Sequence, residues 1–521
     1  MLAIGLAFSG IIAAAGTVAG SAPLAIGGSS EPPGTEVDLA GIDREATVRI
    51  AFAGPINTLD PHKPTNSTYP TWIYPIYDRL FEVDADDNVQ PMLAESSEFS
   101  ADGATLTLHL RDDVVFHDGT PVNAAAVKAS LERAKTVEAS TVANVLAGVT
   151  AIEAVDDQTV ALTLDGVGAE IVAVLASNAG AIINPAVLDD PSVNLDTAPP
   201  IGAGSGPYVA TSSEPNVETG YERAPEYWDD SAGLMQGFTL TRVAQTSTRL
   251  AGLLAGDFDL IMVTADGIEE AEAGLAAGQF SMYVAPGAGQ DIMFNIAGGD
   301  LADVEVRQAV ALALDREEIQ VIYPCVVTTQ PQREGHWAYN PDIVNVYDPD
   351  QARELIDARG GASFELTFAA GSSTEPLATV IQAQLAEVGI TVTLRGIDQA
   401  QVFTSLSDGS AQAIISTMQP GPDPAEVLNR YFLGGTSIAR GTAADELAAI
   451  AAPGADPSLS QDERAAIYHD AFQYIADQYL FVPVCQSEQG WASTSEFVGI
   501  DQMPNYNRGV PDLSSIGVVG S

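Results

Sequence analysis

The sequence predicts an α/β fold with antiparallel additions, and three observations support this. Residues 363–371 alternate apolar and polar side chains, residues 377–388 follow a helical pattern that ends at Gly389, and residues 390–397 alternate again. A strand, a helix and a strand in this order form a βαβ unit. Further strand and helix patterns flank this unit on both sides. The chain also has 521 residues, more than one hydrophobic core sustains, so we expect two or three lobes.

The first half of the chain contributes mainly antiparallel structure. Folding is expected to begin near Ala46, where "ATVRIAFAG" alternates as a strand. Residues 105–110 place three leucines on one face of a second strand. Asn123 is a suitable N-cap for the helix that follows. Residues 149–164 then read as a hairpin with its turn at Asp156-Asp157.

The second half contains longer helices. "QDIMFNIAGG" predicts a strand and a turn, and "DVEVRQAVALAL" follows it with a helical apolar face. Asp315 and Glu318 have capping-box spacing, as do Ser460 and Glu463, so a helix is expected to begin at each pair. The apolar run "YLFVPVCQ" near the end of the chain reads as a buried strand.

The net charge excludes one class of partner. Asp and Glu number 70 against 21 Lys and Arg, which gives a formal charge of -49. A nucleic-acid-binding protein needs a basic surface, and none is visible in the sequence. The charge also opposes docking on anionic lipid. We interpret the acidity as a solvated, self-repelling surface.

The amino terminus resembles an export signal. Residues 1–28 are small and apolar, and residues 29–45 read as a polar linker. No Lys or Arg precedes the apolar run, which departs from the usual signal pattern. "LAIGGSS" resembles a lipoprotein box with Gly in the place of Cys, so a lipid anchor at that position is not expected. We predict an extracytoplasmic protein, and no other run of about 18 apolar residues suggests a membrane span.

The two cysteines, Cys325 and Cys485, allow two interpretations. In an exported protein they could form one disulfide. The alternative is two free, buried thiols.

Possible catalytic motifs are weak. His117 and Asp118 suggest metal or acid–base chemistry, but Asp118-Gly119 reads more simply as a turn. Ser205 lies in a Gly-rich stretch without the strand-then-helix setting of a nucleophile elbow. Cys325 lacks the setting of a reactive thiol. We found no P-loop and no HExxH motif, so we predict no cofactor, no metal site and no catalytic residues.

Five segments, taken in order, resemble the family 5 extracellular solute-binding proteins of ABC importers. The first is "LAESSEFSADGATLTLHLRDDVVFHDGTPVNAAAVKASLERA" at residues 93–134. The other four are "TLDPH" with "IYDRL", "GSGPYV" with "YWD", "FNIAGGDLADVEVRQAVALALDREEI" and "YDPDQARELI". Together they cover nearly the whole folded chain.

This resemblance implies a bilobal periplasmic-binding-protein-like fold, of type II and cluster C, with hinge strands and an extra subdomain. Lobe I would comprise residues 46–84, 196–290 and 485–521. The extra subdomain would comprise residues 85–195, and lobe II residues 291–484. The implied protein is not an enzyme. It would be a monomer that traps a small solute by hinge closure and delivers it to an ABC permease and its ATPase.

The resemblance also implies where the ligand lies. In peptide-binding members an acidic residue of lobe II pairs with the peptide amine, but here Gln419 and Pro420 stand at that place in "ISTMQPGPDP". Peptides with a free amine are therefore less favoured, unless Asp423 or another carboxylate substitutes. A modified peptide, a sugar and a metal chelate remain candidate ligands. The complete set of predicted ligand-binding residues is Asn66, Ser67, Tyr69, Trp72, Gln290, Trp337, Met418, Gln419 and Asp423.

Two other functions remain as alternatives. A secreted hydrolase would require a Ser, a His and a carboxylate to converge. A ligand-sensing surface protein would keep the fold without an importer.

Overall fold

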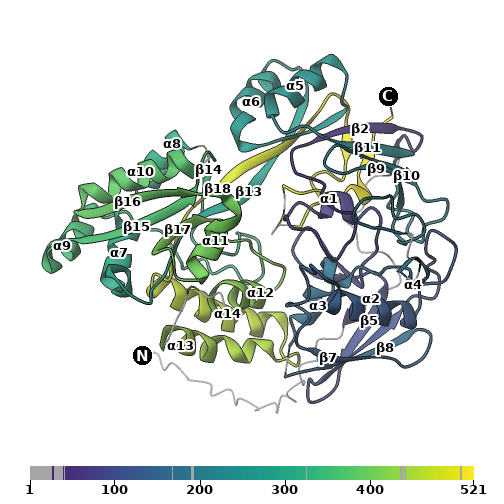
Figure 1. The fold of residues 1–521 in the computed structure, drawn as a ribbon, viewed down its shortest axis with the longest axis horizontal. Helices are drawn as coiled ribbons and strands as arrows, with labels where there is room; N and C mark the ends of the chain where they lie inside the picture. Colours follow the sequence, from purple (N-terminus) through teal and green to yellow (C-terminus); the bar gives the residue numbers. More distant parts are fainter. Residues whose placement is uncertain are drawn as a thin grey trace, which may run out of the picture.

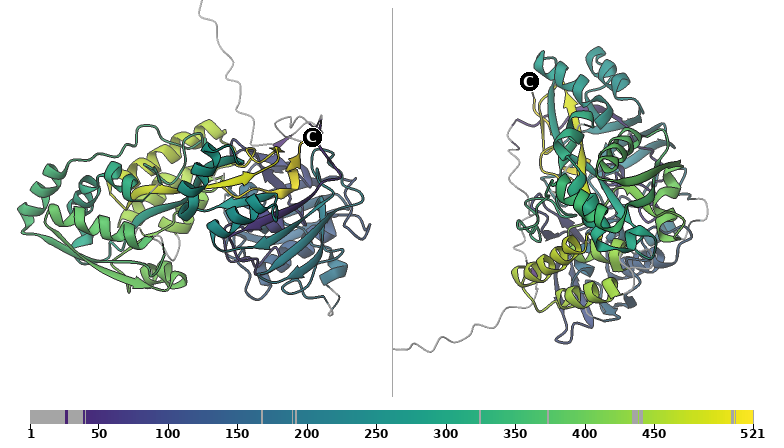
Figure 2. Two further views of the ribbon diagram at one scale, coloured as in Figure 1. Left: turned by 90° about the horizontal axis from the view of Figure 1, so that it is seen from above. Right: turned by 90° about the vertical axis from the view of Figure 1, so that its left-hand side faces the viewer.

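The computed structural model describes residues 26–27, 39, 41–166, 168–188, 190, 193–323, 325–372, 374–433, 438, 442–504, 507 and 509–520. Almost all of the signal-like segment 1–28 and most of the linker 29–45 lie outside these residues. The chain folds into two α/β lobes that lie side by side (Figure 1). Strands coloured teal and yellow pass between them, as the view from above shows (Figure 2).

One sheet of 11 strands extends through both lobes, because two of its strands are shared. The shared strands are β13 (Ser281–Phe294) and β18 (Phe481–Ser493). Lobe I contributes β2 (Thr47–Phe52), β9 (Tyr208–Glu214), β10 (Glu218–Arg223), β11 (Gly237–Arg242) and β12 (Leu260–Val263). Lobe II contributes β14 (Cys325–Val327), β15 (Ala362–Ala369), β16 (Ile390–Ile397) and β17 (Ala413–Ser416).

β13 and β18 run antiparallel and connect the lobes. At one end, residues 490–493 of β18 pair with β12 of lobe I. At the other end, residues 291–294 of β13 pair with β17 of lobe II. The residues between these ends pair with each other, and residues 485–487 also pair with β14. The chain thus enters lobe II along β13 and leaves it along β18. The lobe limits given above remain a prediction.

The subdomain expected in the first lobe is a separate five-stranded sheet. Its order is β1 (Ile26–Gly27), β5 (Ala94–Phe99), β6 (Thr105–Leu110), β8 (Thr159–Leu164) and β7 (Val149–Ala154). The Asn123 side chain accepts from Ala126 N at the start of α2 (Ala124–Thr136), so the predicted cap is confirmed. The predicted turn is also confirmed, because Gly119 has φ +84° and Asp118 Oδ1 accepts from Thr120 N.

Lobe I has its own core and few helices. Trp72, Trp491 and Phe52 pack together at its centre. The helices of this lobe and its subdomain, apart from α2, are α1 (Pro70–Ile73), α3 (Ile171–Val174), α4 (Pro185–Leu188), α5 (Thr246–Ala255) and α6 (Ile268–Ala276). Two small ribbons, β3 (Phe81–Val83) with β4 (Val89–Pro91) and β19 (Phe497–Val498) with β20 (Gly517–Val518), complete this side.

The βαβ unit predicted for lobe II is confirmed, because β15 and β16 pair in parallel on either side of α10 (Thr374–Glu387). The predicted helix starts are confirmed as well. Asp315 accepts from Glu318 N at α8 (Arg316–Ile322), and Ser460 and Glu463 form a capping box at α14 (Gln461–Asp477). The other helices are α7 (Val304–Ala313), α9 (Pro349–Arg359), α11 (Gln399–Ser407), α12 (Pro424–Val427) and α13 (Thr442–Ala451).

Cys325 and Cys485 form a disulfide with a Cα–Cα distance of 5.7 Å. It joins β14 to β18 in the core of lobe II. Within the described residues, no helix has the length and apolar character needed to cross a membrane.

Candidate functional site

A cavity of about 410 Å³ lies between the two lobes. The first-lobe side provides residues 64–67, Tyr69, Ala173, residues 176–178 and several side chains near residue 141. Lobe II provides residues 419–422 together with Glu426 and Arg430. Because both lobes line the same space, a solute held there contacts the two bodies that a hinge moves relative to each other.

The two lobes also touch directly beside the cavity. Ala169 N donates to Ala455 O at 3.0 Å. Gln461 Nε2 donates to Asn88 Oδ1 at 3.3 Å. These bonds join the subdomain side of the first lobe to the end of lobe II that contains α13 and α14 (Figure 1). The structure therefore has its lobes in contact around the cavity.

Glu426, on α12, is the acidic residue of the cavity wall. Its Oε1 is shielded from solvent and has no hydrogen-bond partner in the described part of the chain. Burial, and then the negative charge of Asp423, raise the pKa of Glu426 to about 8, whereas Arg430 acts in the opposite direction. A positively charged group brought into the cavity would supply the partner that this carboxylate lacks.

Glu170 approaches the same region from the first lobe, where it immediately precedes α3. Its Oε2 is also shielded and has no partner among the described residues. Burial and then the charge of Asp423 raise the pKa of Glu170 to about 7, and Arg464 partly offsets this. Glu170 in turn raises the pKa of Glu426. Two carboxyls, one from each lobe, therefore face the junction, and each has a shielded oxygen without a hydrogen-bond partner among the described residues.

Asp423 is different, because its partners are in place. The residue is 4% exposed. Its Oδ1 accepts from Ala425 N and caps α12, and its Oδ2 lies 2.6 Å from Arg464 Nη2. A carboxylate that is already paired and capping gains little from a ligand amine. Asp423 therefore does not take the place of the missing acid, as the sequence analysis had allowed.

Four of the nine predicted ligand-binding residues line the cavity: Asn66, Ser67, Tyr69 and Gln419. Trp337 stands behind the wall, where its Nε1 donates to Pro422 O at 3.0 Å. Gln290 is in β13, 8% exposed, and its Oε1 has no partner within the described residues. Trp337 thus contacts the cavity segment at Pro422, whereas Gln290 lies on a strand that connects the lobes.

The expectation for Trp72 needs correction. Trp72 is fully buried, and its Nε1 donates to Thr58 O at 3.0 Å. Its ring packs in the lobe I core against Phe52. Met418 is also a core residue, 2% exposed, beside the cavity segment rather than on its surface. An aromatic cluster in the sequence does not show which ring faces a cleft. Here Trp72 packs in the hydrophobic core.

Sequence reasoning missed Glu426 and Glu170. Glu426 follows Asp423-Pro424 by two residues, so it lies in the segment that had been singled out. The signal available was an acid in the first turn of a helix that a capping Asp begins. Glu170 gave no such signal, because it reaches the site only through the contact between lobes.

Two of the histidines that a hydrolase could use, His117 and His336, are bonded to the main chain of described residues. His117 Nε2 lies 2.8 Å from Gly206 O, and His336 Nε2 lies 3.3 Å from Pro422 O. Both rings thus bond main-chain carbonyls. Burial lowers the pKa of both, that of His336 to about 4. In the described part of the chain, no group of three or more His, Cys, Asp or Glu side chains could hold a metal ion.

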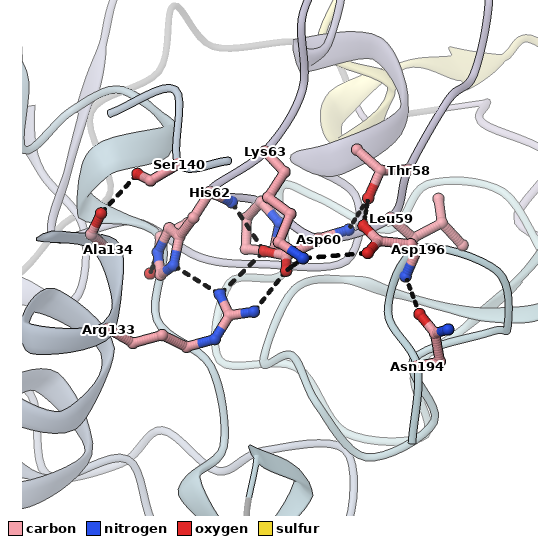
Figure 3. Close-up of polar contacts among 12 residues, drawn as sticks. Thr58, Leu59, Asp60, His62, Lys63, Arg133, Ala134, Ser140, Asn194 and Asp196 are labelled. Atoms are coloured by element: carbon pink, nitrogen blue, oxygen red, sulfur yellow. Dashed lines mark hydrogen bonds and ion pairs between the residues drawn. The ribbon is translucent and has the colours of Figure 1, made fainter. Parts of the chain in front are cut away.

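A polar network underlies the first-lobe wall (Figure 3). Asp60 is 1% exposed and forms a bidentate ion pair with Arg133 of α2. The His62 ring lies between Arg133 Nη1 at 3.0 Å and Ala181 O at 3.3 Å. Lys63 lies 3.0 Å from Asp196 and 3.5 Å from Asp60. The network joins two of the segments that had signalled the family, "TLDPH" and "SLERA", immediately before the cavity-lining residues 64–67.

A family model of bacterial extracellular solute-binding proteins, family 5, matches residues 88–439, which is more than half of the chain. Several curated relatives bear the name glutathione-binding protein GsiB. The protein from Shigella dysenteriae serotype 1 is 26% identical over 490 residues, which cover 88% of this chain and 92% of the relative. The protein from Escherichia coli strain K12 is 28% identical over 366 residues, or 68% and 70% of the two chains.

Solved structures show the same fold. The binding protein AgaA of A. tumefaciens R10, in complex with agropinic acid, superimposes with a TM-score of 0.74 at 25% identity, over 91% of this chain and 99% of that one. The substrate-binding protein CtaP of Listeria monocytogenes gives a TM-score of 0.78 at 21% identity, over 92% and 100% of the chains.

Proposed function

We propose that this chain captures a small solute carrying a positively charged group in the cavity between its lobes. The premise is that the chain belongs to the family 5 bacterial extracellular solute-binding proteins. The family role is that of a substrate-binding protein of ABC importers. The observation that supports the charge of the solute is Glu426, whose shielded Oε1 has no partner within the described residues. A buried carboxylate without a counter-charge is costly, and a ligand cation removes that cost.

A peptide-like solute with a free amine is the leading class. The sequence alone disfavours this class, because Gln419 and Pro420 occupy the expected position of the acid. Glu426 supplies a carboxylate from the same segment, a few residues later. Arg430 also lines the cavity, so the wall carries both signs of charge, as a zwitterion would require. Glutathione is a natural first ligand to test, because curated relatives are named for it.

Binding of such a cation should depend on pH. Because the pKa of Glu426 is about 8, this carboxyl is largely protonated at pH 6 in the empty cavity. A cation favours the ionised form, so binding releases a proton below pH 8. We expect the affinity to rise between pH 6 and pH 8.

Calorimetry can test this proposal. Glutathione, a tripeptide with a free amine and the same tripeptide with an acetylated amine would be titrated into the protein and into E426Q. We expect the free amine to bind, and acetylation or E426Q to weaken binding about 10- to 100-fold, the loss of one charge-assisted hydrogen bond. E270Q, at an exposed glutamate of α6, is the matched control and should bind like the parent protein. Equal affinity for the two tripeptides would contradict the assigned charge.

Export and delivery are the remaining parts of the proposal. The family is extracellular, and the disulfide suits an oxidising compartment. We infer that residues 1–28 direct export and that a membrane permease recognises the closed form, with no catalytic step by this chain. Transport of radiolabelled ligand into vesicles carrying the permease, with and without this protein, would test delivery.

A further inference from the structure

The strands that connect the lobes contain an irregularity at the border of lobe II. Gln290 of β13 pairs with Cys485 of β18, but the next residue, Asp291, pairs with Pro483. Val484 is therefore an extra residue on β18, which makes this point a β-bulge. The main-chain N–H of a bulge residue loses its regular ladder partner and needs another acceptor.

Asp291 lies beside this bulge, because it pairs with Pro483. Its Oδ2 accepts from Met418 N at 3.2 Å. Asp291 is 5% exposed, and burial raises its pKa to about 7, although hydrogen bonding with the main chain of Met418 and Val484 acts in the opposite direction. A single buried carboxyl on a connecting strand is thus bonded to one residue beside the cavity.

The bond to Met418 leads directly to the ligand site. Met418 precedes residues 419–422, which line the cavity. The fit around the carboxylate is close, because a Cβ added at Gly289 would lie 3.2 Å from Asp291 Oδ2 and 3.3 Å from Met418 O. An asparagine would weaken this arrangement, because it lacks the negative charge and could turn its NH₂ group toward an N–H donor.

We propose that Asp291 is a positioning residue that couples the cavity segment 418–422 to the bulge at Val484. When the cavity segment moves, the carboxylate bonded to Met418 moves with it, and the packing of that carboxylate beside the bulge changes. A ligand that holds residues 419–422 thereby favours one arrangement of the strands that join the lobes. This last consequence rests on the proposed function, but the coupling itself is a property of the ligand-free protein.

Hydrogen–deuterium exchange without ligand tests the coupling. G421A perturbs the cavity segment from the ligand side, because its Cβ would lie 2.9 Å from Glu426 Oε2. We expect G421A to speed amide exchange in a peptide covering residues 481–487 about tenfold, the scale of losing one hydrogen bond to a charged group. In D291N the exchange there should already be fast, and adding G421A should not increase it further. D357N, at an exposed aspartate of α9, is the matched control and should leave the effect of G421A intact.

G289A provides a second variant if D291N fails to fold. It keeps Asp291 but crowds its carboxylate away from Met418, so exchange at residues 481–487 should again become insensitive to G421A. If G421A leaves these residues unchanged in the parent protein, or speeds them equally in D291N or G289A, the coupling does not exist. Because no ligand is present, this result is independent of whether a cationic solute binds.

Discussion

Two sets of charged side chains in this molecule differ in whether their partners are present. In the Asp60 network of the first lobe, each carboxylate oxygen faces a cation or a donor, and the His62 ring is bonded on both sides (Figure 3). Burial alone would raise the pKa of Asp60, but the bonds and the charge of Arg133 hold it below its usual value. At the junction of the lobes, burial and like charges raise the pKa of Glu170 and Glu426 to about 7 and 8.

This difference separates groups that stabilise the fold from groups available to a ligand. A buried ion pair with complete bonding is a fixed part of the fold, and removing one member leaves the other without a counter-charge. A carboxyl with a free, shielded oxygen makes the protein less stable when it is ionised. Groups that reduce stability in this way are characteristic of functional sites. The two regions should therefore respond in opposite ways to substitution and to pH.

The largest expected effect is from D60A. This substitution leaves Arg133 buried beside His62 without its carboxylate partner. We expect the free energy of unfolding to fall by about 3–5 kcal/mol, as for other buried pairs that lose one member. Urea denaturation followed by circular dichroism measures it. A loss below 1 kcal/mol would mean that the network does not hold the first lobe together.

The second effect is a loss of stability in acid, and it comes from His62. Burial lowers the pKa of His62 to about 4, so between pH 6.5 and pH 4 the unfolded chain binds more protons than the folded one. The contribution of neutral His62 to the free energy of unfolding is complete above pH 6.5. About 2–3 kcal/mol of it is lost as the pH falls from 6.5 to 4. In H62Q this loss should disappear. Unfolding free energies of the two proteins at pH 7.0 and pH 4.5 provide the comparison, and parallel pH curves would refute the assignment.

The third effect has the opposite sign and comes from Glu426. Its folded pKa is raised to about 8, so its contribution to stability is complete below pH 4.5 and is lost as the pH rises toward and through 8. E426Q should therefore be more stable than the parent protein at pH 8.5, by about 1–2 kcal/mol when partial exposure is allowed for. Melting temperatures at pH 5 and pH 8.5 measure this gain. A loss of stability in E426Q at pH 8.5 would show that Glu426 is a structural group like Asp60.

The smallest effect comes from an exposed ion pair. Asp350 Oδ1 lies 2.7 Å from Arg353 Nη1, but the Asp350 side chain is 90% exposed. D350A should change the free energy of unfolding by less than about 1 kcal/mol, because solvent and salt screen such a pair. The same urea experiment as for D60A measures it. A cost similar to that of D60A would indicate that burial is not what makes the Asp60 network important.

The elements with strong local signals could be predicted from the sequence. Asn123 and Ser460 begin helices because their side chains bond nearby main-chain N–H groups, which neighbouring residues reveal. The βαβ unit is encoded by its own periodicities. The order of segments that resembles family 5 then indicated the two lobes correctly.

The chemistry of the site was harder to predict, because it arises from contacts distant in the sequence. Glu170 and Glu426 are separated by more than half of lobe I and most of lobe II, and only the meeting of the lobes gives them a common environment. Trp72 was assigned to the cleft and is in the core, because its Nε1 finds an acceptor at Thr58 O. Asp291 gave no sequence signal, since its role depends on a bulge in the opposite strand.

The Cys325–Cys485 bond also gives the second lobe an unusual covalent form. The two cysteines are separated by 160 positions in the chain. Most of lobe II, but not α7 and α8, lies between them and thus forms a closed ring of main chain and one disulfide bridge. A single protease cut inside this ring leaves two fragments linked by the disulfide, so a nicked molecule would migrate as one species until a reductant is added. The ring can then be opened at a chosen site, for labelling or for insertion of a reporter, without separating the two fragments.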